Sequence, residues 1–188
     1  MNPNADIIEE CVVFPSQDQM LEGVLAYPAT RVPAHAMLLL SPHPHLGGDM
    51  DNNVIVHLAR RAAQDGCVTL RFNYRGVGKS EMRLPKGVSL FEFWAEMEKN
   101  RRYGVLVPDG ENAARCLLHT AGTAHWTLLG YSLGAVLAGM LRTETKPDRI
   151  IAVSPPVRQV SLKPYRECAV PKFFVGGDSD FAFGRNEF

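Results

Sequence analysis

The sequence Gly130-Tyr131-Ser132-Leu133-Gly134 is the strongest indication of the fold, because its serine lies between two glycines where a strand pattern gives way to a helical one. Residues 125–129 before it are mostly apolar and typical of a buried strand, and residues 135–142 after it follow a helical pattern. A strand that enters a helix through so short a turn holds the serine in a strained backbone conformation, and glycines leave the room that the two elements need. The sequence therefore predicts a serine nucleophile at the tip of a strand–turn–helix unit.

Length and composition predict a single domain over residues 1–188. The chain has 188 residues, of which 46% are hydrophobic, and this is enough for a sizeable core. Twenty Lys and Arg balance twenty Asp and Glu, and the basic residues form no long cluster. A nucleic-acid partner is therefore not expected, because such proteins carry a basic surface, and we expect a small-molecule substrate instead.

The N-terminal residues and the cysteines predict a cytoplasmic protein without a membrane span. Residues 1–6 lack the basic and then apolar order of a signal peptide, and the longest uncharged apolar stretch, residues 126–141, is interrupted by the serine turn. Four cysteines lie in or beside apolar segments without metal-binding spacing, so we expect them to be reduced and mostly buried: Cys11, Cys67, Cys116 and Cys168.

Alternating strand and helix patterns predict an α/β fold with a doubly wound, mostly parallel sheet. Apolar runs indicate strands at residues 11–14, 21–27, 36–40, 67–72, 125–129, 149–153 and 172–175. The first two strands form an antiparallel hairpin in this prediction, with Pro15, Ser16 and Asp18 in its turn.

Three further helices are expected between these strands. Asp51 is predicted to cap a helix whose Val54, Leu58 and Ala62 share one face, and Gly66 ends it. The second begins with a capping box and has four large apolar residues on one side: Leu90, Phe93, Trp94 and Met97. The third is capped by Asp109 and runs to about His119.

A loop rich in histidine and glycine, residues 41–48, follows the strand at 36–40. Ligands of open α/β sheets bind at the carboxyl ends of the strands, and a loop at this position supplies a backbone donor for an oxyanion. That donor is the N–H of His45, because Pro44 has none. A metal pair of His43 and His45 is the alternative, but the acidic residue that such a metallohydrolase motif needs is replaced by Gly47, and a purely structural loop is a third.

Gly78-Lys79-Ser80 suggests a phosphate-binding loop, but the surrounding residues argue against one. The first glycine of that motif is replaced by Asn73, and Pro85 interrupts the helix that should follow. We therefore expect a structural turn in which Arg75 reaches backbone carbonyls or a carboxylate.

Two aspartates, Asp178 and Asp180, follow the last predicted strand. The acid of a serine triad belongs at this point of the chain, and Asp180 is the first choice, with Asp178 the second. Either residue could instead be a turn former.

These four motifs, at residues 43–48, 71–80, 130–134 and 177–180, together resemble the small bacterial α/β-hydrolases of the dienelactone-hydrolase-like serine esterase group. The resemblance covers roughly residues 20–182. It implies that Ser132 is the nucleophile, Leu133 and His45 are the oxyanion-hole donors, and Asp180 is the acid. In that group the catalytic histidine follows the acid after one further strand.

This chain departs from the pattern because all six of its histidines precede Ser132. The C-terminal strand and helix of the fold are therefore expected to be missing. The chain is either a shortened form of a longer hydrolase or a pseudo-enzyme that has lost its catalytic base. We favour the shortened form, because an ordinary fold of this class needs its last strand and helix to cover a sheet edge.

The sequence thus predicts a serine hydrolase of small carboxylic esters or thioesters that acts through an acyl-enzyme on Ser132, with no cofactor and no metal. Residues 85–105 are expected to form a short lid in which Phe91 or Trp94 touches the acyl group, or else packs in the core. The rival hypothesis is an inactive binding or partner module. Assembly into a homo-oligomer is compatible with either.

Overall fold

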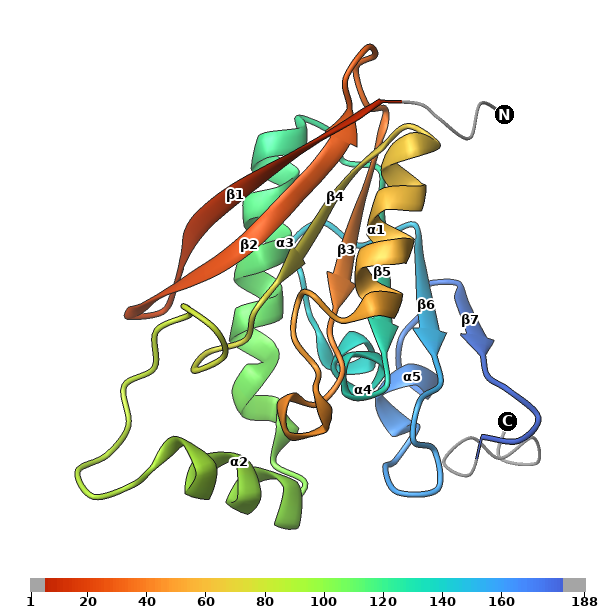
Figure 1. The fold of residues 1–188 in the computed structure, drawn as a ribbon. Coiled ribbons are helices and arrows are strands. Elements are labelled where there is room, and N and C mark those ends of the chain that lie inside the picture. The colour runs from red at the N-terminus through yellow and green to blue at the C-terminus, as the bar shows by residue number, and fades with distance from the viewer. Residues whose placement is uncertain (1–5, 181–188) are drawn as a thin grey trace.

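The computed structural model describes residues 6–180, and within this range seven strands form one twisted sheet in the order β1-β2-β4-β3-β5-β6-β7 (Figure 1). The strands are β1 (Ile7–Ser16), β2 (Gln19–Pro28), β3 (His35–Leu40), β4 (Cys67–Phe72), β5 (Trp126–Tyr131), β6 (Arg149–Val153) and β7 (Lys172–Val175). The pairs β1–β2 and β2–β4 are antiparallel, and the remaining pairs are parallel. The predicted fold class, a mostly parallel sheet after an antiparallel hairpin, is confirmed.

Helices cover both faces of this sheet because successive strand residues point to opposite sides. The helices are α1 (Asn53–Gln64), α2 (Leu90–Lys99), α3 (Val107–Ala121), α4 (Leu133–Met140) and α5 (Lys163–Arg166), with short 3₁₀ turns η1 (Pro44–Leu46) and η2 (Tyr103–Leu106). Leu39 and Leu129 pack with α1 on one face, whereas Leu38 and Leu128 belong to the larger core beneath α3 and α4. Helix α2 lies apart from both layers, near the carboxyl ends of the strands (Figure 1).

The opening hairpin is longer than predicted. Its two strands pair from Ile7 with Pro28 to Ser16 with Gln19, so Gln17 and Asp18 alone make the turn. Gln17 has a positive φ of 56°. Pro15 and Ser16, which the sequence placed in the turn, are the last residues of β1 because their partners in β2 continue the ladder.

Helix α1 begins one residue later than predicted. The cap is Asn52, whose side chain accepts a hydrogen bond from the Val54 N–H, and Asp51 instead pairs with Arg71. Its fully buried residues are Ile55, Ala59 and Ala63, rather than the face of Val54, Leu58 and Ala62. Both sets have helical spacing, so the sequence pattern alone does not choose between two adjacent faces.

Asp109 is not the cap of α3 but lies in its first turn, fully buried. Its carboxylate accepts hydrogen bonds from the Arg75 guanidinium and backbone N–H, and from the Ser16 hydroxyl at 2.8 Å. This pair confirms the expectation that Arg75 reaches a carboxylate. The buried pair fixes the β1–β2 turn, the loop after β4 and α3 to one another.

The segment that suggested a phosphate-binding loop is a turn, as predicted. Gly76 and Gly78 have positive φ values of 74° and 58°, and no helix follows before α2 in the described chain. The Lys79 N–H donates to the Glu22 carboxylate at 2.6 Å. An acidic side chain thus occupies the place where a nucleotide phosphate would have to bind.

All four cysteines are free, as expected, but they are less buried than predicted. Cys11 is exposed and the other three are half-buried. Among the described residues, no helix has the length and apolar character needed to span a membrane.

Candidate active site

The predicted serine turn is present, and its backbone is strained. Ser132 has φ 54° and ψ −111°, between the end of β5 and the first residue of α4. A Cβ atom on Gly130 would lie 2.2 Å from the Gly134 carbonyl oxygen, and one on Gly134 would lie 2.1 Å from the Leu40 carbonyl oxygen. The two glycines are therefore required for the close approach of α4 to β5 and β3.

Ser132 and Leu133 line a pocket of about 210 Å³. Leu133 is the first residue of α4, so its N–H is one of the amides that have no acceptor within the helix. This position suits an oxyanion donor. The polar side chains that share the pocket with Ser132 are His43, His45, Glu98, Tyr103 and Gln159.

The loop after β3 brings His45 to this pocket, but the His45 N–H is already engaged. It donates a hydrogen bond to His43 Nδ1 at 3.1 Å. His43 caps η1 and is only 6% exposed. Burial lowers the pKa of the His43 imidazole, and the nearby Glu98 carboxylate opposes this by raising it. The ring is consequently neutral at physiological pH and available as an acceptor.

Two glycines shape the same loop. Gly47 adopts the left-handed conformation with φ 71°. A Cβ atom on Gly48 would lie 2.3 Å from the carbonyl of Pro42, so any larger residue would push the loop open. The Gly48 N–H donates to the His43 carbonyl at 3.1 Å, which closes the turn.

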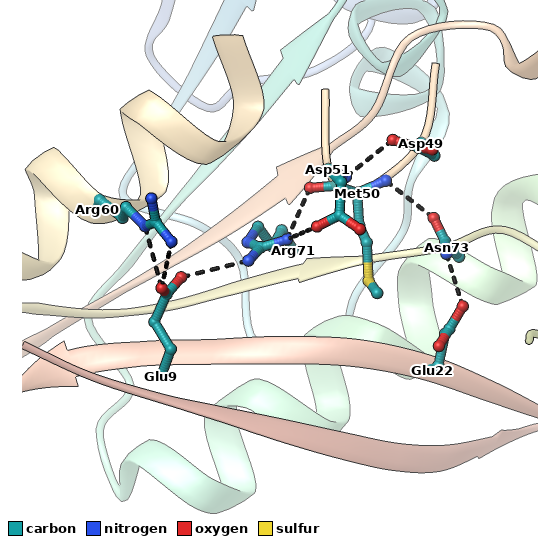
Figure 2. Close-up of polar contacts among 8 residues, drawn as sticks. All are labelled: Glu9, Glu22, Asp49, Met50, Asp51, Arg60, Arg71 and Asn73. Atoms are coloured by element: carbon teal, nitrogen blue, oxygen red, sulfur yellow. Dashed lines mark hydrogen bonds and ion pairs between the residues drawn. The ribbon is translucent and has the colours of Figure 1, made fainter. Parts of the chain in front are cut away.

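Two polar side chains, Arg71 of β4 and Asn73 of the loop after β4, hold the end of the loop that follows β3 (Figure 2). The Arg71 guanidinium donates to the Met50 carbonyl at 3.0 Å and to the Asp51 carboxylate. The Asn73 side chain accepts the Met50 N–H at 2.8 Å and donates to Glu22 at 2.7 Å. Because the Arg71 and Asn73 side chains are buried, their hydrogen bonds to Met50 fix the loop to the sheet and are not easily replaced by water.

Arg71 also links this loop to the first strand. It pairs with Glu9 of β1, which in turn accepts two hydrogen bonds from Arg60 of α1 (Figure 2). These cations lower the pKa of the Glu9 carboxyl, with the Arg60 hydrogen bond as the largest cause. Glu9 is therefore ionised at neutral pH and pairs with both Arg60 and Arg71.

Helix α2 lies against the two histidines of the loop. The His45 ring stacks on Phe91, with ring centroids 5.2 Å apart, and the His43 ring meets the Trp94 ring edge-on at 5.5 Å. Glu98 Oε2 accepts a hydrogen bond from the Tyr103 hydroxyl at 2.7 Å and lies 3.4 Å from His43 Nε2. Sequence reasoning missed Glu98 and Tyr103, because their contact with the pocket depends on how α2 folds back over the loop.

The two candidate acids lie in the turn after β7. The Asp180 N–H donates to the Gly177 carbonyl at 3.1 Å, a hydrogen bond that defines the turn. Neither Asp178 nor Asp180 is among the residues that line the Ser132 pocket. The structure thus places both aspartates after the expected strand without bringing either carboxylate into this pocket.

The other histidines do not line the serine pocket. His35 and His125 both face Asp148, at 3.8 Å and 3.4 Å, and His57 and His119 are exposed on α1 and α3. Within residues 6–180 no group of three or more potential ligands is arranged to hold a metal ion. Only His43 and His45, of the six histidines, line the pocket that contains Ser132.

Strand order, crossover helices and the serine turn together define an α/β-hydrolase fold, and the structural neighbours are α/β serine hydrolase-like proteins. One is an α/β serine hydrolase homologue from Coxiella burnetii, with 28% identity and a TM-score of 0.65 over 90% of this chain and 74% of the other. Another is XC6422 from Xanthomonas campestris, a member of the α/β serine hydrolases without a lid, with 20% identity and a TM-score of 0.71 over 95% and 75% of the two chains.

A sequence relative is the uncharacterized protein RP471 from Rickettsia prowazekii, which is 28% identical over 173 residues. The match covers 90% of this chain and 66% of the relative, so the chain spans about two thirds of that protein's length. No family model matches this sequence.

Proposed function

We propose that this protein is a serine hydrolase of small carboxylic esters or thioesters and that it belongs with the dienelactone-hydrolase-like serine esterases. The observation that carries the proposal is the strained Ser132, held by Gly130 and Gly134 at the mouth of a pocket beside the first amide of α4. A non-glycine residue in such a conformation costs about 1–3 kcal/mol, and residues of this kind cluster at active sites.

In this mechanism Ser132 Oγ attacks the acyl carbon and the substrate oxygen becomes an oxyanion. The N–H groups of Leu133 and His45 stabilise that charge, and each such donor contributes about 10²–10³ in rate. The tetrahedral intermediate collapses to the acyl-enzyme, and the ester C–O or thioester C–S bond breaks to release an alcohol or thiol that takes up the proton removed from Ser132. Water then hydrolyses the acyl-enzyme, which releases the carboxylic acid and restores Ser132. The proton of Ser132 must pass to a base, and by the resemblance this base is a histidine oriented by Asp180 or Asp178.

Residues 85–105 serve as a lid in this proposal. Phe91 and Trp94 of α2 contact the two histidines of the oxyanion loop. Phe91 is 71% exposed, whereas Trp94 is 2% exposed and packs in the core, so Phe91 is the side chain of this pair that a substrate can reach. An apolar side chain in that place would contact the acyl group of a substrate bound at Ser132.

The proposal is tested with a fluorophosphonate probe, which labels an activated and accessible serine. We expect Ser132 to be labelled slowly, because all six histidines of residues 1–188 precede it and the loss of a triad histidine costs up to about 10⁶ in turnover. Ser132→Ala must abolish labelling, and Ser154→Ala, at another serine with positive φ, serves as the matched control. Acyl esters of graded chain length then define the substrate.

The competing function is a binding module without catalysis, and the occupied His45 N–H favours it. A hydrolase needs that donor free, whereas a binding protein does not. Absence of Ser132 labelling would decide for the binding module.

A further inference from the structure

The amide assigned to the oxyanion hole is held by a side chain of its own loop. A backbone N–H has a single proton, and that of His45 is directed at His43 Nδ1, 3.1 Å away. While this hydrogen bond lasts, the amide cannot donate to an oxyanion. Of the two proposed donors, the Leu133 N–H remains.

The hydrogen bond also defines the protonation of His43. Because Nδ1 accepts, it carries no proton, and the proton of the neutral ring is therefore on Nε2. Nε2 is buried and makes no hydrogen bond within the described residues. The carboxylate of Glu98 faces it at 3.4 Å and favours the tautomer with a proton on that nitrogen.

Glu98 is itself fixed by neighbours from two sides. Its carboxylate accepts hydrogen bonds from the Tyr103 hydroxyl and the Arg101 guanidinium. The His43 ring is enclosed by the edge of Trp94 and by the His45 ring, with centroids 5.5 Å away in each case. The ring cannot turn away from the amide unless α2 moves.

We propose that His43 is a latch on the oxyanion hole: its ring holds the His45 N–H, and Glu98 of α2 keeps the ring in the tautomer that does so. Both are positioning residues, since neither touches the reacting atoms. The role rests on the proposed hydrolase function. Displacement of α2, for example by an acyl group bound against the exposed Phe91, withdraws Glu98 and frees the donor when substrate is present.

The latch itself is tested by NMR on the chain with ¹⁵N-labelled histidine, without any substrate. We expect His43 Nδ1 to resonate as an unprotonated acceptor, Nε2 to resonate as a protonated nitrogen, and a scalar coupling to pass from the His45 amide nitrogen to Nδ1. Glu98→Ala should mix the two tautomers, and Glu98→Gln, which keeps an acceptor oxygen, should restore the native one. A proton on Nδ1 of the native chain, or no coupling, would overturn the latch.

Its consequence is tested by the rate at which a fluorophosphonate labels Ser132. His43→Phe keeps an aromatic ring but removes the acceptor, so labelling should rise about tenfold or more, given the weight of one oxyanion donor. His43→Asn is the matched control, because asparagine caps such a turn with its own oxygen and keeps the amide engaged. Labelling should stay slow in His43→Asn and rise in Glu98→Ala.

The outcomes separate the latch from the hydrolase proposal. Equal labelling of native chain and His43→Phe, with Ser132 reacting in both, would refute the latch alone. If His43→Phe does not fold, Glu98→Ala and Glu98→Gln decide the same question. Failure of Ser132 to react in every chain would refute the hydrolase, and the NMR signals would still decide whether His43 holds the amide.

Discussion

The strained turn at Ser132 requires two glycines, one because of a contact close in sequence and the other because of a contact with a distant strand. Gly130 faces the carbonyl of Gly134, four residues further on, so the local sequence alone explains why position 130 must be a glycine. Gly134 faces the carbonyl of Leu40 on the neighbouring strand β3. The second requirement exists only because β3 and β5 pair in register, Leu40 beside Gly130.

Gly134→Ala is therefore expected to destabilise the protein by about 1–3 kcal/mol or more, because the added Cβ would overlap backbone that has no room to move. Gly177→Ala is the matched control, since a Cβ there meets nothing within 4 Å and φ is not positive. Urea unfolding of both variants measures the difference. Equal stability would mean that α4 shifts without penalty.

The strand–turn–helix unit that holds Ser132 could be predicted from the sequence because its strand, turn and helix are contiguous there. His45 was placed near it for a similar reason, since its loop directly follows a predicted strand. Its hydrogen bond to His43 could not be predicted, because it depends on side-chain rotation within the loop. Glu98 and Tyr103 could not be predicted either, because tertiary folding of residues 85–105 brings them to the pocket.

Among the elements, α3 shows how a cap prediction fails when tertiary contacts intervene. The sequence offered Asp109 as a cap, and the helix instead starts earlier, after the 3₁₀ turn η2. Asp109 lies within the first turn, where its charge suits the helix dipole and also pairs with Arg75. In α1 the structure buries the face of Ile55, Ala59 and Ala63 instead of the predicted neighbouring face. Tertiary packing again decides the outcome, because the sequence pattern fits either face.

Asp109→Asn is expected to lower the free energy of unfolding by about 3–5 kcal/mol, because it leaves the buried Arg75 guanidinium without its counter-charge. Asp18→Asn is the matched control. Asp18 pairs with Arg83 on the surface, where such a pair contributes at most about 1 kcal/mol. Thermal or urea unfolding compares them, and a loss at Asp109 no larger than at Asp18 would contradict the role of the buried pair.

At the scale of the whole molecule, buried histidines make stability depend on pH. Burial lowers the pKa of both His43 and His35 below the ordinary value of 6.5. The unfolded chain therefore binds protons before the folded chain does, and the free energy of unfolding must fall as the pH drops through about 6.5. Above that pH the two histidines are neutral in both states and contribute no slope.

Urea unfolding between about pH 8 and about pH 5 measures this slope above the range in which carboxylates titrate. His43→Asn should reduce the slope, because it removes one of the two rings whose pKa burial lowers. His35→Asn should reduce the slope as well, because burial also lowers the pKa of that ring. Stability that rises as the pH falls through this window would show that the two rings are not buried as neutral groups.

The hydrogen bond between Ser16 and Asp109 spans 93 residues and has a consequence for the order of events during synthesis. The opening hairpin is synthesised first, and the carboxylate that anchors its turn is made only 93 residues after Ser16. Both edges of this hairpin of two ten-residue strands are unpaired until β4 covers the β2 edge, and β1 remains an edge strand of the finished sheet. The nascent chain is thus most exposed to mispairing and to chaperones before α3 emerges.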